Sequence, residues 1–219
     1  MARYKSSVEI QGSIGDLVYY QLNGIPVVRR KSGFNKKSFK EKESYQKVRE
    51  NSSEFGHCSK AGKLVREALH ELVPYAEDKY FYQKVAKLMT EIKDLDQSSE
   101  RGKRNVPEGL KGLKAKEVLR NFQWGDMPKV HPKIYIEKDL FSSTLFLPKL
   151  AKGQVLELIT IHLDLSLYEF EIESEEFSLE KSQAIALSES KTSIEVDATL
   201  YFAGVKNKDM NYLQMGFLG

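Results

Sequence analysis

The clearest structural signal in this sequence is Asp16-Leu-Val-Tyr-Tyr-Gln-Leu-Asn-Gly-Ile-Pro-Val-Val-Arg-Arg30, in which two β-prone runs meet at Asn23 and Gly24. Asn-Gly tolerates the positive φ angles that both central residues of a type I′ turn require, so the spacing predicts a β-hairpin with a two-residue turn. Immediately upstream, Gly12 and Gly15 have the G-x-x-G spacing of the loop with which KH domains clamp a nucleic-acid backbone. They precede a strand and do not join two helices, which favours a simple backbone bend.

Downstream of the hairpin the apolar period changes from two to about 3.6 residues, the spacing of a helix face. Apolar residues recur in this way from Tyr45 to Leu72 and again from Phe81 to Leu95, which predicts two packed helices. A third, shorter helix is expected within residues 106–122, where Gly109 and Gly112 interrupt the helix formers. Residues 42–125 are therefore predicted to form a helical region of two to three helices.

Short runs of alternating apolar and polar residues, separated by proline and glycine, predict a β domain over residues 126–219. In residues 168–173 and again in 194–198 the alternation is between apolar and acidic residues, so one face packs on a core and the other is wetted and negative. Six or seven short strands suit an antiparallel sandwich. The predicted fold class is α+β, with an N-terminal β-hairpin and basic arm (1–41), the central helical region (42–125) and a C-terminal antiparallel β-sandwich-like domain (126–219).

The composition narrows the broad class of the protein. Of its 219 residues, 41% are hydrophobic and 30% charged, which is typical of a globular chain and not of a disordered or collagenous one. The one cysteine, Cys58, cannot form an intramolecular disulfide, so the fold needs no oxidising compartment. With neither a secretory leader nor a run of about 18 apolar residues, we expect a soluble, cytoplasmic protein without a membrane segment.

No residue pattern in the sequence has the spacing of a catalytic or metal-binding motif. His57 and Cys58 are adjacent, but neighbouring residues on a helix point about 100° apart, which does not suit a nucleophile and its base. His70, His131 and His162 are scattered without ligand spacing. We therefore expect no catalytic residue, no metal, no cofactor and no small-molecule substrate; only a site assembled from residues distant in sequence would make the protein an enzyme.

The strongest functional candidate is the basic segment from Arg29 to Lys42, which holds seven Lys or Arg and one Glu. Residues 1–60 carry 12 basic against 6 acidic side chains, whereas residues 130–219 carry 8 against 14, so the two ends of the chain have opposite charge. A basic segment with interleaved aromatics suits nucleic acid, an acidic protein surface or a plain solvated linker. The candidate contact residues are Tyr19, Tyr20, Arg29, Arg30, Lys31, Phe34, Lys36 and Lys37 on the basic side, and Glu169, Glu171 and Glu173 on the acidic side.

Opposite charge at the two ends favours head-to-tail contact between copies of the chain, which closes into rings or extends into filaments. The leading hypothesis is a non-enzymatic structural or assembly protein, a homo-oligomer. The alternative is a nucleic-acid-binding protein that uses the basic segment from Arg29 to Lys42.

The stretch from Gly12 to Gly33 resembles the N-terminal signature of a group of uncharacterised proteins from the Bacteroidota. In that group a G-x-x-G, an aromatic strand, an N-G turn and a V-V-R strand precede a helical region and a β-rich C-terminal half. The resemblance covers the hairpin closely and the remainder in outline. It implies the domain layout given above, and no activity or catalytic residue.

Overall fold

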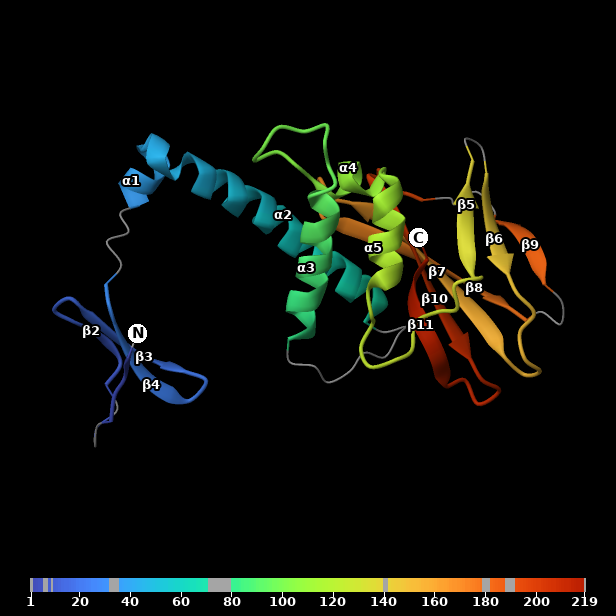
Figure 1. Ribbon diagram of the computed structural model, residues 1–219, viewed down its shortest axis with the longest axis horizontal. Helices are drawn as coiled ribbons and strands as arrows, with labels where there is room; N and C mark the ends of the chain where they lie inside the picture. The colour runs from blue at the N-terminus through green and yellow to red at the C-terminus, as the bar shows by residue number, and fades with distance from the viewer. Residues whose placement is uncertain are drawn as a thin grey trace. The chain divides into compact units, whose positions relative to one another are not determined.

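The computed structural model of the chain describes residues 2–5, 8, 10–31, 36–70, 80–139, 142–178, 182–187 and 192–218 (Figure 1). Its contacts divide the chain into two compact units, residues 1–46 and residues 47–219. The class is α+β: N-terminal strands are followed by a central helical region and by C-terminal antiparallel sheets.

The first unit is a small antiparallel sheet followed by short helical turns. Asn23 and Gly24 have φ angles of 52° and 78°, so the predicted hairpin and its two positive-φ turn residues are confirmed. The four strands lie in the order β1-β4-β3-β2. The elements are β1 (Ala2–Arg3), β2 (Gly12–Ile14), β3 (Leu17–Leu22), β4 (Ile25–Arg30), the helix α1 (Lys36–Glu41) and the 3-10 turn η1 (Glu43–Tyr45).

The helical region is dominated by α2 (Gln46–Leu69), a helix of 24 residues that passes through Gly56 and Gly62 without a break. Its first buried residue is Glu54, so its first eight residues are outside the core. The third expected helix is two helices, because the chain turns at residues 111–112 between them. The remaining helices are α3 (Phe81–Lys93), α4 (Val106–Leu110) and α5 (Leu113–Asn121).

The C-terminal strands form two antiparallel sheets, one of four strands in the order β11-β10-β7-β8 and one of three in the order β5-β6-β9. β9 was not expected from the sequence. Residues 194–197, which alternate as a strand would, lie outside the sheets, and β10 begins at Ala198. The strands are β5 (Tyr135–Lys138), β6 (Ser143–Leu147), β7 (Val155–Asp164), β8 (Glu169–Phe177), β9 (Gln183–Leu187), β10 (Ala198–Lys206) and β11 (Tyr212–Leu218).

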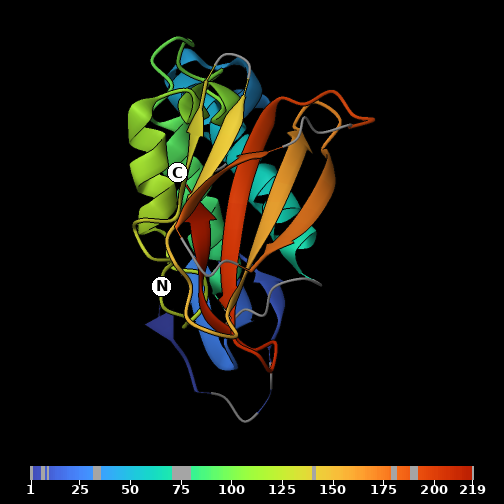
Figure 2. The same ribbon diagram turned by 90° about the vertical axis from the view of Figure 1, so that its right-hand side faces the viewer.

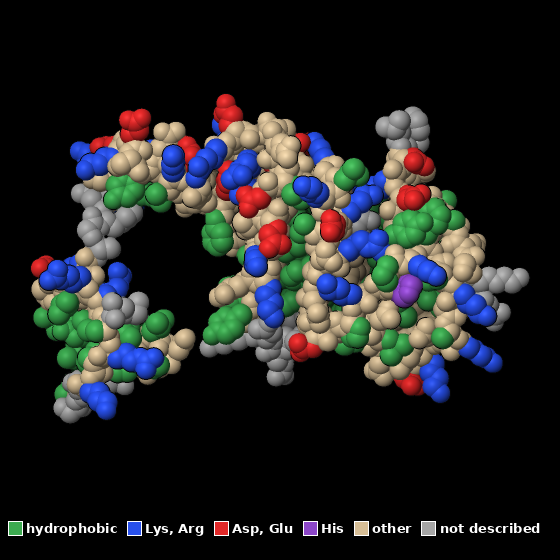
Figure 3. All heavy atoms as spheres, viewed as in Figure 1, with side chains coloured by type: hydrophobic (Ala, Val, Ile, Leu, Met, Phe, Trp, Pro, Cys, Tyr) green, Lys and Arg blue, Asp and Glu red, His purple; other side chains and the backbone are tan. Residues whose placement is uncertain are grey.

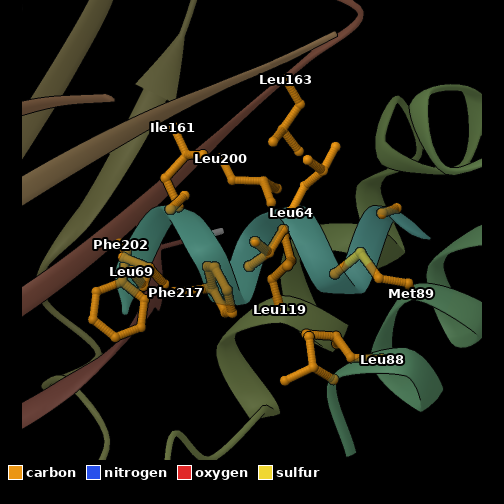
Figure 4. Close-up of a cluster of buried hydrophobic side chains, with 14 of the residues drawn as sticks. Leu64, Leu69, Leu88, Met89, Leu119, Ile161, Leu163, Leu200, Phe202 and Phe217 are labelled. Atoms are coloured by element: carbon orange, nitrogen blue, oxygen red, sulfur yellow. The ribbon is translucent and has the colours of Figure 1, made fainter. Parts of the chain in front are cut away.

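The helical region packs on the β domain, because one hydrophobic cluster joins α2, α3 and α5 to one face of the four-stranded sheet. In Figure 4 the side chains of Ile161, Leu163 and Leu200 lie on one side of α2, and those of Leu88 and Leu119 lie on the other. The second half of α2 is therefore covered on two sides. This explains why most of the buried residues of α2 lie between Cys58 and Leu69.

A second hydrophobic cluster fills the space between the two sheets. Leu156 and Leu158 of β7 face this cluster, whereas Ile159 and Ile161 of the same strand face the helices. β7 is thus buried on both faces, which accounts for its nearly continuous apolar sequence. Figures 1 and 2 show the resulting layers: helices, the four-stranded sheet and the three-stranded sheet.

Candidate interaction surfaces

The predicted basic residues of the hairpin are divided between the two faces of the N-terminal sheet. Successive residues of a strand point to opposite faces, so Tyr19 and Tyr20 do not form one surface. The Arg29 guanidinium lies 5.9 Å from the centre of the Tyr20 ring, and Tyr19 meets Tyr4 edge-on at 5.3 Å. Arg29 and Arg30 are both exposed, again on opposite faces.

This sheet buries very little apolar surface of its own. Val27 is the one buried residue among those described in the unit, whereas Ile14, Leu22 and Ile25 are 59%, 47% and 39% exposed. Small sheets need a second layer or another support to be stable. Figure 3 shows hydrophobic and basic side chains together on the surface of this sheet. One face carries Val18, Tyr20, Leu22, Ile25 and Val27, and the other carries Ile14, Leu17, Tyr19 and Val28.

The basic arm that follows the hairpin is structured at both of its described ends. Lys31 continues the hairpin, because its backbone N–H donates to the carbonyl oxygen of Asp16 at 2.7 Å. Lys36 and Lys37 are exposed in the first turn of α1, and Phe39 packs edge-on against Tyr45 at 5.8 Å. Phe34 lies outside the described residues. The segment is therefore not a plain linker over the parts described.

The predicted acidic residues lie on β8, the edge strand of the four-stranded sheet. Glu169, Glu171 and Glu173 share one face of this strand, and Phe170 points to the other face, where it packs on the helical core. Glu175 continues the acidic face and is exposed. Acidic side chains on an edge strand discourage unintended pairing with strands of other molecules. They also attract a basic partner.

Two of these glutamates are engaged within the chain. Glu171 accepts hydrogen bonds from the hydroxyl and the backbone N–H of Ser193, which lower the pKa of its carboxyl. Glu173 lies 3.9 Å from Nε2 of the buried His162. The exposed acidic surface is therefore carried more by Glu169 and Glu175 than by the central pair.

A buried ionic network that the sequence analysis did not predict joins α2, α3 and the loop before α4. The Glu54 carboxylate is buried, and it accepts hydrogen bonds from Lys93 at 2.8 Å, from the backbone N–H of Gly102 at 2.7 Å and, through two nitrogens, from Arg104 at 2.9 and 2.7 Å. Lys93 is also buried, and its ammonium contacts Asp94 at 2.5 Å. The paired charges hold the loop against the two helices.

The network should make the stability of the fold depend on pH. Hydrogen bonds from Arg104, followed by those from Lys93 and Gly102, outweigh burial and lower the pKa of Glu54 from 4.5 to about 2. A lowered pKa gives stability that is complete above the unfolded value and is lost as the pH falls toward the folded value. Between pH 6 and pH 3, we expect the free energy of unfolding to fall by about 2 kcal/mol from Glu54 alone. Urea denaturation at both pH values measures this loss, and a Glu54→Gln variant with the same pH dependence would contradict the assignment.

A second buried network lies at the far end of the four-stranded sheet. The Glu157 carboxylate accepts hydrogen bonds from the Lys206 ammonium at 2.9 Å and from the Tyr212 hydroxyl. Burial and the bond to Glu157 raise the pKa of Tyr212. Gly204 makes room for the Tyr212 ring, because a Cβ at this position would lie 2.3 Å from a ring carbon. This network ties β7, β10 and β11 together and leaves Tyr212 un-ionised.

The other histidines and the cysteine form no recognisable reactive group. Cys58 is completely buried, and burial raises the pKa of its thiol. The neighbouring His57 accepts a hydrogen bond at Nε2 from the backbone N–H of Val106 at 3.2 Å. His131 is exposed, whereas His162 is buried. Within the described ranges, no three His, Cys, Asp or Glu side chains gather in a way that could hold a metal ion.

Comparisons with protein-family models, with curated proteins and with solved structures give no match to this chain. Among the helices that the structure describes, none is long and apolar enough to span a membrane.

Proposed function

We propose that the protein is a non-enzymatic assembly protein that associates with copies of itself, head to tail, into a ring or a filament. The contact joins the N-terminal sheet and basic arm of one copy to the acidic β domain of the next. The observation that carries the proposal is the N-terminal sheet, which has apolar side chains on both faces and one buried residue among those described. Covering such a sheet with a neighbouring copy supplies the missing layer.

Charge supports the same pairing. No described carboxylate forms an ion pair with Arg29, Arg30 or Lys36, so these cations are available to a partner. On the β domain, the edge strand β8 presents Glu169 and Glu175 to solvent. Complementary charges of this kind orient two surfaces and exclude incorrect partners more than they add affinity. The apolar side chains of the sheet add a contribution that salt does not screen. High salt screens only the charged part of the contact and so should shift the oligomer toward smaller species.

The first test is the molar mass of the purified protein, measured by light scattering during size-exclusion chromatography at about 0.02 M and about 1 M salt. Because salt screens exposed charges within a few ångströms at the higher concentration, we expect species larger than the 25.1 kDa chain at low salt and a smaller mean mass at high salt. A monomer under both conditions would contradict the proposal.

A mixing experiment separates head-to-tail assembly from other association. One variant combines Arg29→Gln with Arg30→Gln, and the other combines Glu169→Gln with Glu175→Gln, so that neither altered surface gains a charge that could attract the other. Each variant retains one intact surface, so each should be monomeric alone, and an equimolar mixture should stop at dimers. Lys114→Glu, an exposed change on α5, is the charge-matched control and should assemble as the wild type does. Larger species in either variant alone would rule out these residues.

The alternative function is nucleic-acid binding through the same basic segment, and the chromatography at two salt concentrations also tests it. It predicts a monomer whose ultraviolet absorbance shows copurified nucleic acid that high salt removes, because each displaced counterion weakens binding as salt rises. That result, with no larger protein-only species, would replace the assembly proposal.

A further inference from the structure

A pocket of about 430 Å³ lies between α2, the loop of residues 102–105 and the turn from β7 to β8. It lies entirely within the second unit. Its lining is mostly polar and includes the Tyr168 ring, two serines and the side chains of Glu54, His57, Lys60, Lys103, Arg104 and Asn105. These residues come from three segments that are distant in sequence.

The hydrogen-bond acceptors in the pocket wall are already occupied. The Glu54 carboxylate receives four hydrogen bonds, two from Arg104 and one each from Lys93 and Gly102. These occupy all of the roughly four lone-pair sites of its two oxygens. The Asn105 side-chain oxygen caps α4 by accepting from the backbone N–H of Glu108 at 3.0 Å. A ligand that needs acceptors in the wall would therefore find few available.

The donors, in contrast, are available. Nε2 of His57 accepts from the backbone N–H of Val106, which places the ring proton on Nδ1. Burial lowers the pKa of this imidazole. The Lys60 ammonium lies 4.4 Å from the centre of the Tyr168 ring, and no described carboxylate forms an ion pair with it. The pocket thus offers a cation and an imidazole N–H. The Asp197 carboxylate, whose charge acts on the His57 ring, accepts hydrogen bonds from the backbone N–H of Leu165 and the hydroxyl of Ser166.

Tyr168, which lines the pocket, has a strained backbone conformation. Its φ angle is +60°, which aromatic residues seldom adopt. The turn is fixed by Asp164, whose carboxylate accepts from the backbone N–H groups of Ser166 and Leu167 at 2.8 and 2.7 Å. The strained turn keeps the Tyr168 ring against Lys60 and 6.5 Å from the ring of His57.

We propose that this pocket binds a compact oxyanion of the phosphate class, held by the Lys60 ammonium and the Nδ1–H of His57. A phosphate group carries negative charge and accepts several hydrogen bonds, which suits one ammonium and one imidazole donor. The volume exceeds that of the ion alone, so the pocket also has room for the small organic part of a phosphate ester.

The test is a titration of the full chain with inorganic phosphate at constant ionic strength, followed by NMR of the histidine imidazoles. We expect saturable shifts of the His57 signals and a rise in the pKa of His57, because a bound anion stabilises the imidazolium. His131, which is exposed, is the internal reference and should not move with the same saturation curve. Equal responses of His57 and His131 would overturn the proposal.

Two lysine variants complete the test. Lys60→Gln should weaken phosphate binding at least about tenfold, the usual effect of losing one charge-assisted hydrogen bond. Lys63→Gln, one turn further along α2 and paired with Glu67 at 3.4 Å, is the matched control and should bind as the wild type does. Equal loss in both variants would leave only a general charge effect and would contradict the site. Tighter binding of a phosphate monoester than of inorganic phosphate would identify an organic phosphate as the ligand, and the reverse order would identify the free ion.

Discussion

Replacing Glu54 with glutamine should lower the free energy of unfolding by about 3 kcal/mol, because removing one partner of a buried ion pair leaves the other charge without compensation. Lys93 would stay buried beside an uncharged amide, and Arg104 would lose a two-point contact. Urea denaturation measures the change, and the fluorescence of Trp124 reports it, since this one tryptophan is fully buried in the core of the second unit.

The control for this variant is Glu67→Gln on the same helix. Glu67 is about half exposed and pairs with the exposed Lys63, a contact of the kind that contributes at most about 1 kcal/mol. If both variants lose the same small amount of stability, the buried network is not an important contribution to the fold.

Replacing Gly109 with alanine should lower the free energy of unfolding by about 3 kcal/mol or more, at the upper end of the effects of overpacking. A Cβ at this position would lie 2.0 Å from the carbonyl oxygen of Ile92 and 2.7 Å from its carbonyl carbon. Both atoms belong to the backbone of α3, so no side-chain rotation relieves the clash, and α3 and α4 would have to separate.

Gly56→Ala provides a control with the opposite expected sign. Gly56 is also helical, but a Cβ there meets no atom within 4 Å. Alanine should therefore stabilise α2 by about 0.5–1 kcal/mol through its better helix propensity. The pair is measured by urea denaturation under identical conditions, and a Gly109→Ala variant as stable as Gly56→Ala would show that α3 and α4 do not pack as closely as described.

Features determined by neighbouring residues could be predicted from the sequence. The hairpin depends on Asn23 and Gly24 alone, and the long helices depend on apolar spacing within one segment. The strand expected at residues 194–197 was wrong because its alternation serves another purpose: Asp197 accepts a hydrogen bond from the backbone N–H of Leu165 at 2.8 Å and so holds the turn that follows β7. β9 was missed because its sequence, Gln-Ala-Ile-Ala-Leu, has weak strand propensity.

Features that depend on distant residues could not be predicted. The partners of Glu54 lie 39 and 50 residues away, and the contact of Lys60 with the Tyr168 ring joins α2 to the turn before β8. One signal was present in the sequence: Glu54 lies four residues before Cys58, on the helix face that is otherwise apolar, and a charge in such a position needs a buried partner. For Gly109, the sequence suggested only a weakened helix, whereas the structure requires the absence of a side chain.

The continuity of α2 has a mechanical consequence for any assembly built from this chain. Its 24 residues form a rod of about 36 Å, whose first residue, Gln46, ends the N-terminal unit and whose second half is enclosed by the core. A tensile load on the N-terminal sheet therefore enters the body through this rod. Along it, the contacts of Glu50 and Asn51 with Arg101, at 3.4 and 3.0 Å, come before the buried ion pairs of Glu54. These polar contacts therefore bear the load before the hydrophobic core does.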